Sequence, residues 1–178
     1  LKNSPAEPKA EWEVAIIGIG PAGLSAAVLA KQHNLRYLGL EREQVLATIA
    51  AYSENKYLFF KPETMAARGG LPIAGDGDQR ENILESWIAT MMSNGVVINE
   101  HENCIGVERA ADGDYFTIQT EKGKKGESCA YRVRHVVLAL GNRGAPMRLG
   151  VPGEDIKISR NGHLGDKVMY ALSKPDEI

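Results

Sequence analysis

The residues best suited to chemistry are three glycines and one carboxylate near the start of the chain. Gly18, Gly20 and Gly23 form the pattern Gly-x-Gly-x-x-Gly, and Glu41 follows at about the 20-residue distance typical of dinucleotide-binding motifs. A backbone without side chains lets a diphosphate approach closely, and a carboxylate can accept hydrogen bonds from both ribose hydroxyls. The set predicts a site for the diphosphate and one ribose of a dinucleotide. Glu41 would repel a 2′-phosphate, which disfavours NADP there. The alternative is a glycine-rich turn in an ordinary α/β domain.

A strand, a helix and a second strand are needed to position these residues. The apolar run Val14–Ile17 predicts a buried parallel strand, after which Gly18 lets the chain turn sharply. A helix is expected to begin near Pro21, so that its free N–H groups and positive dipole end face the ligand's negative charge. Gly23 would let this helix pack tightly against the first strand. The second strand, Tyr37–Leu40, ends at Glu41.

The remaining segments predict an α/β unit with an inserted β-meander. A short strand is expected at Tyr57–Phe60, an amphipathic helix at Arg80–Asn94, and further strands at Val96–Ile98, Cys104–Glu108, Tyr115–Thr120, Ser128–Val133 and Val136–Gly141. The last of these is expected to be a buried parallel strand that ends in glycine, as the first one does. In a doubly wound sheet such strands lie side by side, and ligands bind at their carboxyl ends. Gly141 would then face the same dinucleotide, although a simple strand-ending glycine is the alternative. The predicted class is a Rossmann-like α/β fold with a central parallel sheet and helices on both faces.

Composition and charge exclude several classes of function. The chain has 178 residues and a formal net charge of −2, with acidic and basic residues interspersed. No basic face indicates nucleic-acid binding, and no long apolar run indicates a membrane span. Residues 1–12 read as a polar linker, and the absence of an initial Met leads us to expect a longer protein with a fused upstream domain. The two cysteines, Cys104 and Cys129, form no motif, which fits a reducing cytoplasm. None of the four histidines shows metal-ligand spacing, and we identify no catalytic acid, base or nucleophile.

Several segments resemble one family of flavoproteins. GIGPAGLSAA together with Glu41 resembles the FAD-binding opening of proteins with two dinucleotide-binding domains. VVLALGNRGAPMRLGVPGED, residues 136–155, resembles the segment that closes the first part of the FAD domain in thioredoxin-reductase-like proteins. ATIAAYSENKYLFFKPE, GLPI and ENILESW fit the branch related to bacillithiol disulfide reductases. The resemblance covers roughly residues 13–178, and it implies an FAD domain over 13–155 followed by an irregular tail over 156–178.

The resemblance implies FAD bound in an extended pose. By position, the residues implied at the diphosphate are Gly18, Gly20, Pro21 and Ala22. Glu41 would bind the adenosine ribose with Arg42 alongside, and Thr48 and Ile49 would approach the flavin half. Cys104 occupies a position whose backbone meets adenine in the family. Ala139, Leu140 and Gly141 would line the ribose and diphosphate from the other side.

The family also implies a reaction, in which a hydride passes from NAD(P)H to FAD and electrons then pass to a disulfide or a small-molecule acceptor. NAD(P)H would bind a second glycine-fingerprint domain, which this sequence does not contain. The electron acceptor, the choice between NADH and NADPH, and a homodimeric state stay open. Two other functions also stay open: a flavin-dependent monooxygenase of the same architecture, and a non-enzymatic nucleotide-binding regulatory module.

Overall fold

The centre of the fold is a five-stranded sheet. The computed structural model describes residues 10–60, 69–73, 75–111, 113–141, 148–160, 163–166 and 168. The strands of the sheet lie in the order β2-β1-β7-β6-β5. Their bounds are Trp12–Ile17 (β1), Tyr37–Leu40 (β2), Glu102–Arg109 (β5), Phe116–Lys122 (β6) and Glu127–Leu138 (β7). β1 pairs in parallel with β2 and β7, whereas β6 runs antiparallel to β5 and β7. The predicted α/β class, with a parallel centre and an antiparallel meander, is confirmed.

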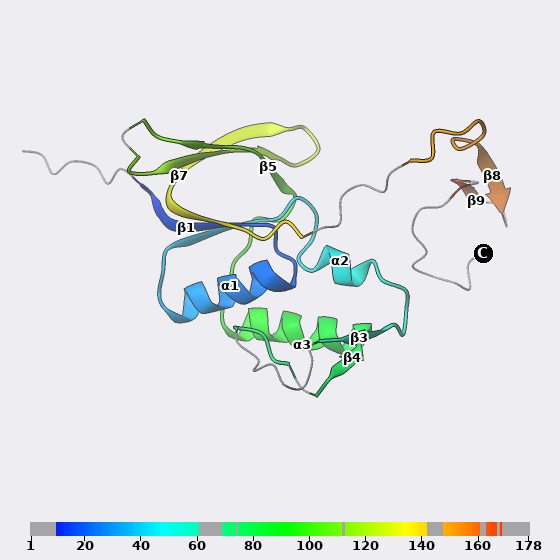
Figure 1. Cartoon of the computed structure of the whole chain (residues 1–178), viewed down its shortest axis with the longest axis horizontal. Coiled ribbons are helices and arrows are strands. Elements are labelled where there is room, and N and C mark those ends of the chain that lie inside the picture. The colour runs from blue at the N-terminus through cyan, green and yellow to red at the C-terminus, as the bar shows by residue number, and fades with distance from the viewer. Residues whose placement is uncertain are drawn as a thin grey trace, which may run out of the picture.

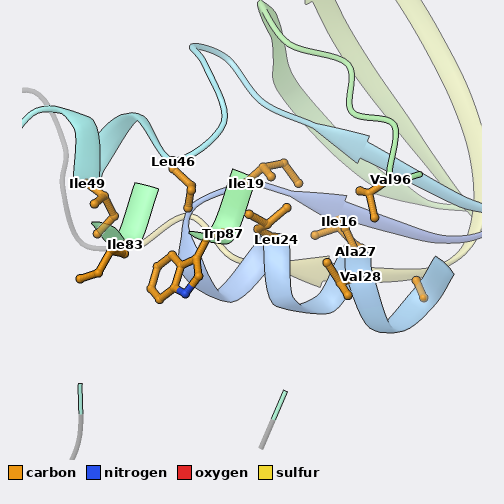
Figure 2. Close-up of a cluster of buried hydrophobic side chains, with 11 residues drawn as sticks. Ile16, Ile19, Leu24, Ala27, Val28, Leu46, Ile49, Ile83, Trp87 and Val96 are labelled. Atoms are coloured by element: carbon orange, nitrogen blue, oxygen red, sulfur yellow. The ribbon is translucent and has the colours of Figure 1, made fainter. Parts of the chain in front are cut away.

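Two longer helices lie on the same side of this sheet (Figure 1). They are α1 (Pro21–Gln32) and α3 (Arg80–Ser93), and a short helix α2 (Ala47–Ala50) follows β2. Their apolar side chains form one core with Ile16 of β1, as Figure 2 shows. The other buried members of this core are Ile19, Leu24, Ala27, Val28, Ala30, Leu46, Ile49, Ile83, Trp87 and Val96.

The second face of the sheet has a separate core. It consists of the buried residues Ala15, Ile17, Leu38, Leu40, Ile118 and Val133. Ala15 and Ile17 flank Ile16 in β1, so the strand alternates between the two cores as a strand buried on both faces must. All six residues belong to strands, because β6 and β7 supply the apolar side chains that a helix would otherwise supply. In the described residues the meander therefore completes this core, in place of the helix expected on that face.

β7 is a single strand of 12 residues, where the sequence predicts two separate strands. Its pairing with β6 ends at Val133, and its pairing with β1 continues to Leu138. Beyond Val133, β1 is the one described strand beside it. This explains why Leu138 and Leu140 are each 65% exposed, although the sequence predicts a buried parallel strand.

The strand predicted at Val96–Ile98 is reduced to one isolated parallel bridge between Leu40 and Asn99. Only a few residues separate the end of α3 from His101, which turns the chain with a φ of 55°. Ile98 nevertheless packs on β2, since its Cδ1 lies 2.5 Å from where a Cβ on Gly39 would stand. The Val96–Ile98 segment therefore packs on β2 as a third strand would, but without a ladder of backbone hydrogen bonds to it.

Two further antiparallel pairs lie outside the main sheet. β3 (Tyr57–Phe59) pairs with β4 (Gly77–Gln79), and β8 (Lys157–Arg160) pairs with β9 (His163–Asp166). The second pair lies in the tail that was expected to be irregular. The expected helix near 168–172 and the Gly144–Pro146 segment fall outside the described residues, apart from Val168. In the part of the chain that the structure describes, no helix is long and apolar enough to cross a membrane.

Candidate functional site

The carboxyl ends of β1, β2 and β7 meet at one edge of the sheet, where the glycine turn lies. The Gly18 N–H donates to the Leu40 carbonyl at 2.9 Å, and the Ala139 N–H donates to the Ile17 carbonyl at 2.8 Å. Gly18 has a φ of +89°, and a Cβ there would lie 2.6 Å from the Ala139 oxygen. Only glycine tolerates both the conformation and this close approach. The structure thus brings the two predicted glycine-ended strands together.

The N-terminus of α1 opens directly from this turn. Gly20 is the N-cap, no side chain among the described residues caps the helix, and no acidic residue lies in its first turn. A Cβ on Gly20 would meet no heavy atom within 4 Å, so open space lies in front of this backbone. Pro21 occupies a first-turn position, where its missing N–H costs nothing. Uncapped helical N–H groups beside open space suit a diphosphate.

Gly23 serves packing, as predicted. A Cβ at this position would collide with the Gly18 carbonyl oxygen and would lie 3.4 Å from Ala139 Cβ. The absent side chain lets α1 approach the turn closely. Ala22 stands beside it in the first turn of the helix.

The Glu41 carboxylate is directed onto the glycine turn. One oxygen accepts a hydrogen bond from the Ile19 N–H at 2.7 Å, and the other accepts one from the Glu43 N–H at 2.9 Å. A carboxylate has about four lone-pair sites, so two remain for further donors such as ribose hydroxyls. The side chain therefore lies beside the glycine turn, and its contact with a ribose stays a prediction. The role of Ile19 was not foreseen, because it depends on how the second strand folds back.

Leu46 holds the same turn from the other side and is a second residue that the sequence did not reveal. Its N–H donates to the Ile19 carbonyl at 2.9 Å, and its side chain is fully buried. The backbone has a φ of 60°, which is costly for a leucine. Both backbone polar groups of Ile19 are thus hydrogen-bonded, the N–H to Glu41 and the carbonyl to Leu46.

The positions expected near the ribose and flavin differ in their surroundings. Arg42 is exposed, and its guanidinium lies 3.4 Å from the Glu43 carboxylate. Ile49 is 7% exposed and packs in the first core with Trp87, so its side chain is not free to contact a ligand. Thr48, its neighbour in α2, is half-buried.

Cys104 lies on β5, the edge strand that begins beside Glu41. The Glu102 N–H donates to the Glu41 carbonyl at 2.9 Å, which places the start of β5 against the end of β2. The Cys104 thiol is half-buried and lies 3.7 Å from the Gly106 carbonyl oxygen. Burial raises the pKa of this thiol, which makes it a poor nucleophile. That its backbone meets adenine while its side chain is incidental stays a prediction.

The segment after β7 lines the opposite side of the turn. The backbone of Ala139 and Leu140 lies against Gly18, within 3.3 Å of where its Cβ would stand. Gly141 follows with a φ of +66° and open space around it. Ala139 and Leu140 therefore lie next to the turn, and Gly141 follows them in the chain.

Other features of the described residues do not add a site. No group of His, Cys, Asp and Glu in this part of the chain could hold a metal ion. An open hollow of about 290 Å³ lies at the amino ends of β1 and β2, away from the glycine turn. It is lined by Trp12, Lys31, Asn34, Leu35, Arg36 and Tyr37.

Comparison with known proteins identifies the family. The family model described as pyridine nucleotide-disulphide oxidoreductase matches residues 15–169. A ferredoxin–NADP reductase from Ignicoccus hospitalis is 30% identical over 161 residues, which cover 89% of this chain and 46% of that protein.

Solved structures share the fold. The bacillithiol disulfide reductase from Bacillus cereus is similar with a TM-score of 0.65 and 24% identity, over 82% of this chain and 44% of that one. OTEMO, solved in complex with FAD and NADP, is similar with a TM-score of 0.63 and 16% identity, over 83% of this chain and 29% of that one. The chain spans less than half the length of each of these proteins. With its glycine turn, its acidic residue after β2 and the family match over most of its length, the chain belongs to the pyridine nucleotide-disulphide oxidoreductase family.

Proposed function

We propose that this chain binds the adenosine and diphosphate half of FAD in an oxidoreductase that takes electrons from NAD(P)H. The observation that carries the proposal is the Glu41 carboxylate, bonded to the Ile19 N–H at 2.7 Å beside the uncapped N-terminus of α1. That arrangement offers a hydrogen-bond acceptor for ribose and a set of donors for a diphosphate, a few residues apart. The family match supports a redox role for the ligand.

Each described part of the site has a task in this proposal. The N–H groups at the start of α1 bind the diphosphate, and the empty space at Gly20 admits it. Glu41 accepts hydrogen bonds from the ribose, and the Ala139–Gly141 backbone closes the other side. FAD would accept a hydride from the nicotinamide and pass electrons on, while the protein supplies position and electrostatics.

We propose a separate site for NAD(P)H. The described residues carry one glycine turn of this kind, and the Glu41 carboxylate disfavours a 2′-phosphate there. FAD and NADP are both present in the OTEMO complex, which supports two sites in one protein of this fold.

We propose a disulfide or a small molecule as the electron acceptor of the full-length protein. The ferredoxin named for the Ignicoccus hospitalis relative is a further candidate. Reduction of each acceptor by NADPH and by NADH, in the full-length protein, distinguishes these cases.

The cofactor proposal is tested by titrating the purified chain with FAD and with ADP in a calorimeter. ADP reports on the adenosine half alone, whatever contacts the flavin makes. Replacing Glu41 with alanine should weaken both ligands by about 1–3 kcal/mol, because the ribose hydroxyls lose their acceptor. Glu43→Ala is the matched control, since this exposed carboxylate pairs with Arg42. Equal affinities of wild type and Glu41→Ala for ADP, or no binding of either ligand by wild type, would contradict the proposal.

A further inference from the structure

Glu102 is a fully buried carboxylate at the first position of β5, with no exposed surface. One of its oxygens accepts hydrogen bonds from the Thr120 hydroxyl at 2.7 Å and the Tyr131 hydroxyl at 2.8 Å. The other accepts one from the Asn99 side-chain amide at 3.1 Å, and the Lys122 ammonium lies 3.9 Å away. Burying a carboxylate is costly unless it is hydrogen-bonded and paired. The partners of Glu102 meet this requirement, and the elements that supply them show which parts of the fold the carboxylate joins.

The partners of Glu102 come from two different parts of the fold. Thr120 and Tyr131 belong to β6 and β7, so those bonds hold the meander together. Asn99 lies outside the meander, in the turn between α3 and β5, at the one bridge to β2. The Glu102 carboxylate therefore joins the meander to the turn formed by Asn99, Glu100, His101 and Glu102, which we call the 99–102 turn.

The 99–102 turn is bonded to the loop that follows β2 at successive positions. The Glu41 N–H donates to the Asn99 carbonyl at 2.9 Å, and the Glu102 N–H donates to the Glu41 carbonyl at 2.9 Å. The His101 N–H donates to the Glu43 carbonyl at 3.1 Å. Glu100 accepts a hydrogen bond from the Val45 N–H at 2.7 Å. Residues 41–45 are thus fixed along their length by this one turn.

Glu41 is consequently held at its backbone by the 99–102 turn and at its side chain by Ile19 and Glu43. We propose that Glu102 is a positioning residue, which acts through Asn99 and the 99–102 turn to hold the Glu41 carboxylate on the glycine turn. The consequence for ligand binding rests on the dinucleotide site proposed above. The positioning itself is a property of the ligand-free chain and is tested separately.

The informative variant is Glu102→Gln, which keeps the size of the side chain and removes its charge. A charged acceptor makes stronger hydrogen bonds than a neutral one, and the amide replaces one acceptor oxygen with a donor. Glu108→Gln makes the same chemical change at an exposed position of the same strand and is the matched control. Asn99→Ala breaks the same connection from its other end and serves if Glu102→Gln does not fold.

The direct measurement is amide hydrogen exchange in the ligand-free chain. The Ile19 and Glu43 amides, which donate to Glu41, should exchange roughly tenfold faster in Glu102→Gln and in Asn99→Ala. The Leu24 amide, which donates to the Gly20 carbonyl within α1, is an internal reference for the stability of the neighbouring helix. Its exchange rate should be unchanged, which separates local loosening from global destabilisation.

The second measurement is calorimetric titration with ADP, whose affinity should fall in both variants by a similar factor, while Glu108→Gln binds as wild type does. Acceleration of all three amides by the same factor would overturn the proposal, because Glu102 would then support the fold as a whole. Unchanged exchange at Ile19 and Glu43 would also overturn it. If wild type binds no ADP, the proposed function fails, while the exchange rates still decide whether Glu102 positions Glu41.

Discussion

Alanine at Gly23 should destabilise the fold, whereas alanine at Gly20 should leave the fold intact and remove ligand affinity. The two glycines flank the start of α1, but a Cβ would meet different surroundings at each. At Gly23 it would collide with the Gly18 carbonyl oxygen and lie 2.9 Å from the Gly18 carbonyl carbon. At Gly20 it would meet nothing within 4 Å.

The magnitude at Gly23 follows from the rigidity of what the new methyl group meets. Gly18 cannot move away, because its N–H is bonded to Leu40 and its backbone lies against Ala139. Overpacking of this kind costs about 1–3 kcal/mol. The better helix propensity of alanine returns up to about 1 kcal/mol. The difference is a net loss of up to about 3 kcal/mol. A loss in the middle of this range, about 1–2 kcal/mol, lowers the melting temperature by roughly 2–8 °C in a chain of this size.

The change at Gly20 has two small and opposite effects on stability. Alanine is a poorer N-cap than glycine, which lowers the stability of the fold by up to about 1 kcal/mol. The unfolded chain with alanine has less conformational entropy to lose, which raises the stability by up to about 1 kcal/mol. The backbone of Gly20 has φ −74° and ψ −166°, which alanine adopts freely. The melting temperature of Gly20→Ala should therefore stay close to that of wild type. Affinity for ADP should fall, because the methyl group occupies the space proposed for the diphosphate.

Both variants are measured by thermal unfolding of the ligand-free chain and by titration with ADP. The reasoning is refuted if Gly23→Ala melts no lower than Gly20→Ala, since the collision is then relieved at no cost. It is also refuted if Gly20→Ala binds ADP as tightly as wild type does. In that case the open space at Gly20 does not receive the ligand.

Three further outcomes are expected. Burial and the hydrogen bond to Glu102 raise the pKa of the Tyr131 phenol in the folded chain. The stability that the neutral phenol contributes is therefore present below about pH 10, the pKa in the unfolded chain, and is lost as the pH rises through the higher pKa of the folded chain. The free energy of unfolding in urea should accordingly depend less on pH above about 10 in Tyr131→Phe than in wild type. The raised pKa of the Cys104 thiol should make its alkylation by iodoacetamide slower at pH 8 than that of a small free thiol, and an equal rate would contradict the described burial. Ile49→Val should cost about 0.5–1.5 kcal/mol of stability in urea unfolding and leave ADP affinity unchanged, because the side chain lies in the core.

The parts of the candidate site whose residues lie close together in the sequence could be predicted from it. Gly18, Gly20, Gly23 and Glu41 belong to one strand-turn-helix-strand unit, whose spacing fixes their relative places. The same holds for β2, whose predicted and observed bounds agree at Tyr37–Leu40. Local pattern was sufficient there because β1, the turn, α1 and β2 follow one another directly in the chain.

The contribution of Glu102 could not be predicted, because its partners are distant in sequence and meet only when β5, β6 and β7 pair. A glutamate next to an expected strand normally predicts an exposed side chain. One signal was present in the sequence, since Glu102 is two residues before the apolar Cys104 and so shares its face of the expected strand. The joining of two expected strands into β7 was missed for a similar reason: the polar Arg134 and His135 resembled a break, whereas they are exposed positions of a continuous strand.

The length of β7 has a consequence for how the protein is made. β1 emerges from the ribosome well before β7, yet one of its two edges pairs with β7, in which Val136 and Leu138 lie opposite Ala15 and Ile17. At the usual rates of synthesis, that edge stays open for on the order of ten seconds after β1 has been translated. An open apolar strand edge is a template for pairing with other chains. We therefore expect chains truncated before Leu138 to aggregate. In a series of truncated chains of increasing length, the length at which the chains become soluble should mark the point at which β7 pairs with β1.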